Sequence, residues 1–420
     1  MRMRLSKIFV ASVAAALIAQ GFVAGCTFDR TQSGHAAAPL EIEKPASRQP
    51  WKRYADWPQG NWKDFNTLVT NASPPVSKPP AVAYPIQGDS DKGKKLAFDR
   101  SRGGSCVACH VMGSSTPSLP GNVGPDLSAI GSQRPDDWLF GYVWDARNVN
   151  PQTVMPPWGT NRLFTADEIK DIVAFLKTLQ TPYVLKDANE DPNRRELAPD
   201  DRDAMDPTEN PALFALDEGK ALFAQPGPTG KSCASCHAEP AKSFRSWAAT
   251  MPYFEPRVNK VLGVEEFVTR HARATTGADY LLESKQNLAL SIYLRNLANG
   301  ETIAIDTSSP GAKAAVARGN DLLERPIGQL NFSCTDCHQK AADHWIRGQW
   351  LGDLNGQLGR HPYFRTSQGD VWDLRKRFQW CGVAVRANEL SPDAPAYGDL
   401  ELALTVLNQG RKLATPGIGH

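Results

Sequence analysis

Length, composition and charge set broad limits on this chain. It has 420 residues, enough for two to four domains, and its 47 basic and 45 acidic side chains leave a formal net charge of +2 at pH 7. This balance excludes a strong overall field of the kind that steers proteins to nucleic acid or to acidic substrates. Abundant glycine (33) and proline (32) indicate small domains joined by extended segments.

The first 26 residues are typical of a bacterial export signal of the lipoprotein type. Three basic side chains within the first seven positions precede an apolar stretch at 8–23. Residues 23–26, VAGC, are similar to a lipobox and predict a lipid anchor on Cys26; ordinary cleavage near 36–38 is the alternative. Both predict a periplasmic protein, and the first adds attachment to the membrane. No later segment of the sequence is long and apolar enough to span a bilayer.

A Pro-rich tether is predicted over residues 27–85, where NASPPVSKPPAVAYP is representative. After it one module occurs three times, over residues 86–181, 208–306 and 307–420. The stretch 182–207 is acidic, contains proline and lacks a hydrophobic period, so we expect a solvated linker there. Only a short break near 307–310 separates the second module from the third, which predicts that these two pack as one body.

Every module is predicted to begin and end with a helix. Short helical patterns stand at 89–99, 217–224 and 317–325, and amphipathic patterns that begin at Thr165, Ser284 and Asp399 end the modules. Thr165 and Glu168 form a capping box, which marks the start of the first of these last helices. Its apolar residues at helical spacing are Ile169, Ile172, Val173 and Leu176.

Between its helices each module carries a C-x-x-C-H motif: CVACH ending at His110, CASCH ending at His237, and CTDCH ending at His338. This motif attaches a c-type haem, because its two thiols add to the porphyrin and the adjacent histidine becomes an iron ligand. A zinc site would need a fourth ligand beside each motif, and a redox dithiol would not need the histidine. The sequence therefore predicts three covalently bound c-type haems, attached to Cys106, Cys109, Cys233, Cys236, Cys334 and Cys337.

A first and a last helix that cross over a haem are the arrangement of class I cytochrome c folds. We therefore expect an all-α protein with three class I cytochrome c-like domains in tandem, the last two packed together. Such a domain buries the porphyrin as much of its core and needs little other apolar mass.

The sixth ligand of each haem sets its potential and reactivity. For the first haem the candidate is Met155, about 45 residues after His110 and ahead of the last helix, which predicts His/Met ligation and an electron carrier. The second module offers Met251 and His271. His271 lies just before the final helix region, so we expect it to complete a bis-histidine haem; an exposed loop histidine is the alternative.

Cys381 follows the third motif by about 43 residues, where a distal ligand is expected. Outside the motifs and the signal segment it is the only cysteine, and a lone thiol in an oxidising compartment is a liability unless it has a function. A buried, unreactive cysteine is the alternative. Nearby cations make a thiolate more available, and Arg375, Lys376, Arg377 and Arg386 surround it in the sequence. We interpret Arg375 and Lys376 as surface residues, whereas Arg377, one turn before Cys381, should share its helix face.

Two stretches resemble the subunits of SoxXA, a cytochrome family of bacterial thiosulfate oxidation. Residues 88–181 resemble SoxX, most clearly in GGSCVACH, PGNVGPDLSAIG and WDARNVNPQTVMPPWGTNRLFTADEIKDIVAFLKTL. Residues 208–412 resemble a di-haem SoxA, most clearly in GQLNFSCTDCH and LRKRFQWCGVAVRANEL. The chain is thus similar to a SoxX–SoxA fusion, in which the last two modules form the di-haem SoxA-like body.

This resemblance implies roles for particular residues. Cys381 matches the active-site cysteine, which ligates the catalytic haem and is found as a persulfide in the family, and Arg377 matches the arginine beside it. Met155 matches the SoxX methionine ligand. The first haem of di-haem SoxA usually has a cysteine as its distal ligand, whereas the aligned residue here is His271.

The activity implied is that of an L-cysteine S-thiosulfotransferase. It joins thiosulfate to a cysteine thiol of the carrier protein SoxYZ and passes two electrons through its haems to a small acceptor cytochrome c. Three alternatives stay open: a thiosulfate dehydrogenase that makes tetrathionate, an electron relay in which Cys381 only tunes a potential, and a peroxidase, which would need a vacant axial position. His361 or Arg360 could line a substrate channel, which the sequence alone does not decide.

Overall fold

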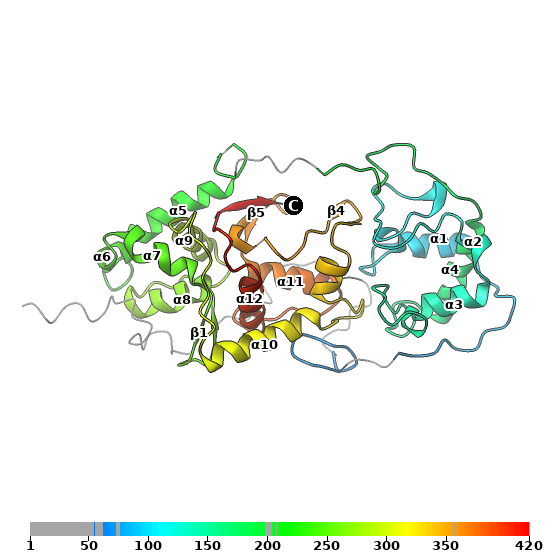
Figure 1. Ribbon diagram of the computed structural model, residues 1–420, viewed down its shortest axis with the longest axis horizontal. Helices are drawn as coiled ribbons and strands as arrows, with labels where there is room; N and C mark the ends of the chain where they lie inside the picture. The colour runs from blue at the N-terminus through cyan, green and yellow to red at the C-terminus, as the bar shows by residue number, and fades with distance from the viewer. Residues whose placement is uncertain are drawn as a thin grey trace, which may run out of the picture.

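The computed structural model describes Tyr54 and residues 62–72, 76–197, 204–206, 208–356 and 358–419. The predicted signal peptide, Cys26 and most of the first half of the tether lie outside these ranges. The described chain is mostly helical, and Figure 1 shows three sets of helices in a row, with residues 212–296 at one end, 310–407 in the middle and 90–178 at the other end. No helix in the described ranges has both the length and the apolar character that a membrane span needs.

The first module contains α1 (Ser90–Phe98), α2 (Ile130–Gln133), α3 (Asp136–Trp144) and α4 (Ala166–Thr178). Single 3₁₀ turns at Cys106–Ala108, Gly113–Ser115 and Ala146–Asn148 lie between them. The predicted capping box is confirmed, because Thr165 Oγ1 accepts from the Glu168 backbone N–H and the Glu168 carboxylate accepts from the Thr165 backbone N–H. The four apolar residues predicted for the inner face of α4 are all buried.

The second and third modules combine helices with short strands. The second contains α5 (Ala212–Ala224), α6 (Cys233–Cys236), α7 (Pro240–Ala249), β1 (Tyr253–Glu255), β2 (Lys260–Leu262), α8 (Val264–Thr275) and α9 (Lys285–Asn296). The third contains α10 (Pro310–Glu324), β3 (Trp345–Ile346), β4 (Gln349–Trp350), β5 (Tyr363–Arg365), β6 (Asp370–Trp372), α11 (Leu374–Ala384), α12 (Pro395–Leu407) and β7 (Gly417–Gly419). Antiparallel hairpins join β1 to β2, β3 to β4 and β5 to β6, and β7 pairs with β5 in parallel.

Part of the second module recurs in the third at a constant separation. α8 begins at Val264 and α11 at Leu374, 110 residues later, and each helix directly follows an antiparallel hairpin, β1–β2 or β5–β6. The same separation relates Thr302 to Lys412, whose backbones form an isolated antiparallel bridge. A contact between two equivalent residues is what a local two-fold axis produces, so the two modules are related by such an axis at this point.

In each module the first helix crosses the last helix at a glycine. A Cβ atom added there would lie only 1.9, 2.0 or 2.2 Å from a backbone oxygen of the last helix, and the pairs are Gly93 with Asp171, Gly219 with Ala289, and Gly319 with Asp399. Any side chain would push the two helices apart, so glycine permits the same close crossing three times.

The second and third modules share a hydrophobic core, and the third also has a core of its own around Phe378 and Tyr397. The core around Phe223, Val261 and Leu290 also contains Ala315 and Leu402, which come from α10 and α12. The first module has a separate core, to which the third module contributes Leu330. Burial of a common apolar core holds the second and third modules together as one body.

Hydrogen bonds also tie the first module to the third. The backbone N–H of Arg347, at the tip of the β3–β4 hairpin, donates to the Ala108 backbone oxygen (2.9 Å). The Asn122 backbone N–H donates to the Trp345 backbone oxygen (3.0 Å), and the Trp345 N–H donates to the Asn122 side-chain oxygen (2.8 Å). The hairpin therefore contacts the chain directly at the first haem motif.

Two segments predicted as a tether and as a solvated linker are packed in part. Residues 65–68 of the tether are buried, and the Asn66 backbone oxygen accepts from the Gly328 N–H (2.9 Å). In the linker, the Glu190 carboxylate accepts from the backbone N–H of Leu119 (2.6 Å). The prediction is wrong for these residues because their partners are distant in the sequence and composition does not reveal them; residues 198–203 and 207 lie outside the described ranges.

Gly93→Ala tests the close helix crossing. The added methyl group would overlap the backbone of α4, so we expect the first module to lose about 1–3 kcal/mol of unfolding free energy, the usual cost of overpacking. Gly141→Ala is the matched control, because Gly141 lies inside α3 and its added Cβ would be 3.7 Å from the nearest atom, on Pro79. There alanine should stabilise by about 0.5–1 kcal/mol. Denaturant unfolding of the two variant holoproteins measures both changes in unfolding free energy. Equal losses of unfolding free energy in the two variants would contradict the role of the crossing.

Candidate active site and haem-binding residues

The first haem motif holds His110 as an iron ligand requires. His110 Nδ1 donates a hydrogen bond to the Pro125 backbone oxygen (2.7 Å), which leaves Nε2 as the nitrogen that can bind iron. Gly124 lets the ring lie this close, since a Cβ there would be 2.2 Å from a ring atom. Burial lowers the pKa of His110, which favours the neutral form that ligates metals.

The other two motif histidines lie in similar surroundings. His338 Nδ1 donates to the Gly352 backbone oxygen (2.7 Å), and His237 Nδ1 lies 3.4 Å from Ser243 Oγ. Burial lowers the pKa of both imidazoles. Haem attachment at Cys236 stays a prediction.

His271 lies near His237, with the rings at a separation that fits one iron between them. Their ring centroids are 6.3 Å apart. An iron bound by both rings would lie about 2 Å from each nitrogen, and a nitrogen lies about 1.1 Å from its ring centre, so about 6.2 Å is expected. Met251, the other candidate, is 2% exposed and lies in the apolar core. The geometry thus favours His271 as the sixth ligand of the second haem.

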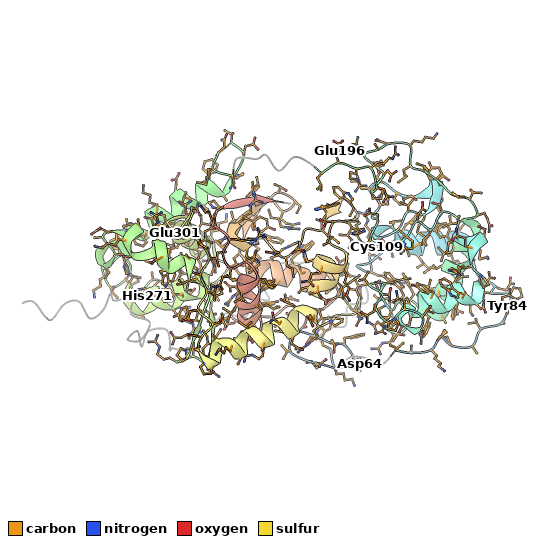
Figure 2. All side chains as sticks on the ribbon, in the orientation of Figure 1. Asp64, Tyr84, Cys109, Glu196, His271 and Glu301 are labelled. Atoms are coloured by element: carbon orange, nitrogen blue, oxygen red, sulfur yellow. The ribbon has the colours of Figure 1, made fainter. Side chains whose placement is uncertain are left out.

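One continuous cavity of about 1660 Å³ connects the first and third haem motifs. Its volume exceeds the usual range of single small-molecule sites, and its walls carry the residues predicted to attach and ligate two haems. In Figure 2, Cys109 lies on the side of the first module that faces the third, and His271 lies far away in the second module. The volume and the donor set fit two haems; the lining includes Cys106, Cys109, His110, Met155, Cys334, Cys337, His338 and Cys381.

Cys381 and Arg377 lie on α11 and both line this cavity, as one helical turn between them predicts. The Arg377 guanidinium lies 4.6 Å from the ring centroid of Trp380, and its Nη1 is buried with no hydrogen-bond partner among the described residues. Burial raises the pKa of the Cys334 thiol to about 12, and the nearby Cys381 thiol adds to this rise. The helix thus brings a sulfur and an unsatisfied cationic donor to one wall of the cavity.

The prediction that Arg375 and Lys376 are surface residues is wrong, since they are 2% and 6% exposed. Arg375 donates to Glu266 (2.8 Å), away from the cavity, and Arg386 donates to a backbone oxygen of the first module. Of the four basic residues near Cys381 in the sequence, Arg377 is the one that lines the described cavity. Arg375 and Arg377 are two positions apart, so they lie on different faces of the helix. Their closeness to Cys381 in the sequence does not show this difference.

Arg365 is a cavity residue that was not predicted. It is 1% exposed, and its guanidinium lies 4.8 Å from the Trp380 ring centroid. His361 and Arg360, considered as channel residues, also line the cavity. The sequence contains a repeat that could have indicated this segment. PYF occurs at 252–254 and again at 362–364, and the two copies have the same spacing to His271 and to Cys381, respectively.

Comparisons with known proteins show which families this chain is similar to. The family described as SoxA/TsdA, cytochrome c domain, matches residues 218–303, and the family described as Cytochrome c matches residues 90–180. The L-cysteine S-thiosulfotransferase subunit SoxA of Chlorobaculum tepidum is 28% identical over 209 residues, which cover 49% of this chain and 71% of that protein. These matches support a SoxA-type cytochrome. The two cytochrome c domain matches imply covalently bound c-type haem with iron.

Other relatives of this chain carry the same subunit name. That of Allochromatium vinosum is 29% identical over 209 residues (48% of this chain, 72% of that protein), and that of Paracoccus pantotrophus is 27% identical over 230 residues (54% and 75%). Among solved structures, SoxXA from P. pantotrophus has a TM-score of 0.46 at 24% identity, covering 51% of this chain and 80% of that one. Thiosulfate dehydrogenase (TsdBA) from Marichromatium purpuratum has a TM-score of 0.21 at 16% identity (77% and 68%).

His271→Ala should open the sixth position of the second haem. Loss of a strong axial nitrogen converts a low-spin ferric haem to high spin, so we expect a high-spin signal from about one haem per chain. Met251→Leu is the control, because it keeps the apolar volume in the core and should leave the spectrum of the SoxA-type cytochrome unchanged. Electron paramagnetic resonance of the oxidised holoproteins measures this. A high-spin signal in Met251→Leu alone would move the assignment to Met251.

Proposed function

We propose that this SoxA-type cytochrome is an L-cysteine S-thiosulfotransferase, which joins thiosulfate to a cysteine thiol of a carrier protein of the SoxYZ kind. One observation carries the proposal: Cys381 and Arg377 share a helix face and line the cavity that reaches two haem motifs. A sulfur for covalent chemistry, a cation for an oxyanion and attachment sites for electron carriers thus meet in one space.

The proposal includes three haems in three cytochrome c-like domains, of which the first is SoxX-like. When bound, the haems take up and pass on single electrons, which lets a two-electron oxidation deliver to a small acceptor cytochrome c. The proposed holders are Cys106, Cys109, His110 and Met155 for the first, Cys233, Cys236, His237 and His271 for the second, and Cys334, Cys337, His338 and Cys381 for the third.

The reaction divides into two balanced steps at the Cys381 sulfur. In the first step the Cys381 thiolate forms a bond to the outer sulfur of thiosulfate, which gives Cys381–S–S–SO₃⁻ and releases two electrons. In the second step the carrier thiolate attacks the sulfur next to Cys381, takes over the S–SO₃⁻ group and releases the Cys381 thiolate. In sum, one carrier thiol and one thiosulfate give the carrier S-thiosulfonate, one proton and two electrons.

Arg377 is the residue we assign to the sulfonate end of thiosulfate. Its buried Nη1 can donate a charge-assisted hydrogen bond to a sulfonate oxygen, and the Trp380 ring supports the guanidinium plane. Arg365, on the same indole, adds a second positive charge near the site. Two cations on one wall favour a dianion over neutral sulfur compounds.

The deciding experiment follows reduction of an acceptor cytochrome c by thiosulfate, with and without a SoxYZ-type carrier. The proposal expects reduction that requires the carrier, together with the mass of a thiosulfonate on the carrier cysteine. Reduction without carrier, with tetrathionate as product, would assign a thiosulfate dehydrogenase instead. No reduction in either case would leave an electron relay.

Cys381→Ala should abolish carrier-dependent turnover while the haem content per chain stays unchanged, because the sulfur is lost but no attachment site is. Arg377→Gln should retain all sulfur chemistry and lose about 2–3 kcal/mol of transition-state stabilisation, roughly a 30- to 150-fold fall in kcat/KM. Steady-state kinetics and pyridine haemochrome assays measure both. Full turnover in Cys381→Ala would remove Cys381 from the mechanism.

A periplasmic location is part of the same proposal. It is supported by the export-type start of the sequence and by the c-type haem of the family. Cell fractionation tests it, and holoprotein found in the cytoplasm would contradict it. The lipid anchor predicted on Cys26 lies outside the described residues, and mass spectrometry of the mature N-terminus tests it.

A further inference from the structure

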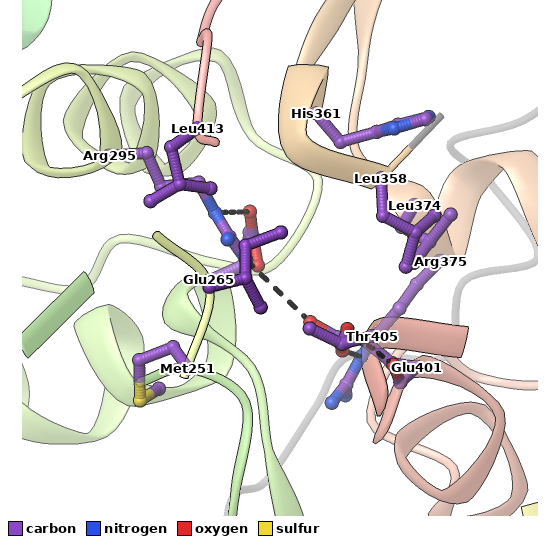
Figure 3. A pocket seen from close by; sticks show the side chains of 11 residues that line it. Met251, Glu265, Arg295, Leu358, His361, Leu374, Arg375, Glu401, Thr405 and Leu413 are labelled. Carbon is purple, nitrogen blue, oxygen red and sulfur yellow. Dashed lines mark hydrogen bonds and ion pairs between the residues drawn. The ribbon is translucent and has the colours of Figure 1, made fainter. Parts of the chain in front are cut away.

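Seven charged side chains form a buried cluster where the second and third modules meet. Each is at most 9% exposed, and they are Lys260, Glu265, Glu266, Arg270, Arg295, Arg375 and Glu401. Four of them, Glu265, Arg295, Arg375 and Glu401, line a cavity of about 20 Å³, which has room for about one water molecule. Figure 3 shows Arg295 beside Glu265, and Arg375 beside Glu401. We call this set the interface ion cluster.

The small cavity lies on the local two-fold axis. Its lining contains four pairs of residues 110 positions apart: Met251 and His361, Glu265 and Arg375, Arg295 and Thr405, and Ile303 and Leu413. At one pair the charge is inverted, with an acid on α8 and a base on α11. Like charges across the axis would repel in this buried place, whereas opposite charges favour one arrangement of the two helices.

Arg375 connects α11 to two other helices. Its Nη1 donates to Glu266 Oε2 on α8 (2.8 Å) and to the Pro392 backbone oxygen (2.8 Å), and its Nε donates to Glu401 Oε2 on α12 (3.0 Å). Buried ion pairs add little net stability, because desolvation offsets much of the attraction. Their directed hydrogen bonds do set the rotation and position of a helix. On α11 they fix which side chains face the large cavity.

We propose that Arg375 is a positioning residue for the active site. It holds α11 against α8 and α12, so that Arg377 and Cys381 on the other side of the helix face the large cavity. The inference rests on the proposed function, which assigns the active site to Cys381 and Arg377. It also assigns a task to the second module, whose haem motif does not line the described part of the cavity: its helix α8, which carries His271, supports the helix that carries Cys381.

Arg375→Met tests the proposal. The variant should fold, because Glu266 keeps Lys260 and Arg270 as partners, both at 2.8 Å. In the holoprotein we expect the alkylation rate of Cys381 by iodoacetamide, measured by peptide mass spectrometry, to change at least tenfold, with a similar loss of carrier-dependent turnover. Arg375→Lys should restore at least half of the wild-type behaviour, since a charge and a donor return.

Arg270→Met is the matched control. It removes another buried partner of the same Glu266 carboxylate, and its hydrogen bonds to Glu266 lie within α8, so Cys381 should react as in the wild type. A Cys381 rate within threefold of wild type in Arg375→Met overturns the proposal, as does an equal change in Arg270→Met. If Arg375→Met gives no holoprotein, Glu401→Gln, which weakens the Nε contact, replaces it under the same criteria. The alkylation comparison decides the inference even if the wild-type protein fails to transfer thiosulfate.

Discussion

The close crossing of the first and last helix in each module is the constraint from which the haem sites follow. At Gly93, Gly219 and Gly319 the helix backbones approach to distances that exclude any side chain. The C-x-x-C-H motif begins eight to ten residues after the last residue of the first helix, so the crossing limits where the two thiols and the histidine can lie. Covalent attachment at such a place lets a large prosthetic group complete a core that few side chains could fill.

One scaffold serves two purposes in the second and third modules. His271 is the eighth residue of α8 and Cys381 the eighth residue of α11, so the two side chains hold equivalent places in the repeat. In the second module Phe267 stacks on His271, with ring centroids 5.3 Å apart, whereas the equivalent residue of the third is Arg377. An imidazole beside an apolar ring suits a closed iron site. A sulfur beside a guanidinium suits a site that binds and oxidises an anionic sulfur compound.

The junction of the first and third modules brings two haem motifs to one cavity within a single chain. A backbone hydrogen bond links Arg347 to Ala108 in the first motif, and the lining of the cavity comes from both modules. Because the two modules are covalently joined, their association costs no translational entropy at each encounter, unlike that of separate subunits. Buried residues from the N-terminal side contact both modules, since Phe65 lies beneath Arg162 of the first and Asn66 accepts a hydrogen bond from Gly328 of the third.

Local information was sufficient for much of this protein. The motif chemistry needs only residues within one turn, the capping box needs two residues three positions apart, and Arg377 and Cys381 share a face because helix geometry places them there. Only tertiary contacts decided which basic side chains line the large cavity and which candidate ligand of the second haem lies near His237. Arg375 turns away to Glu266 from another module, Arg365 arrives from a β-hairpin, and His271 is distinguished from Met251 by its distance to His237. Each of these outcomes depends on partners more than ten residues away, and such pairings are set by the burial of a shared core rather than by neighbours in the sequence.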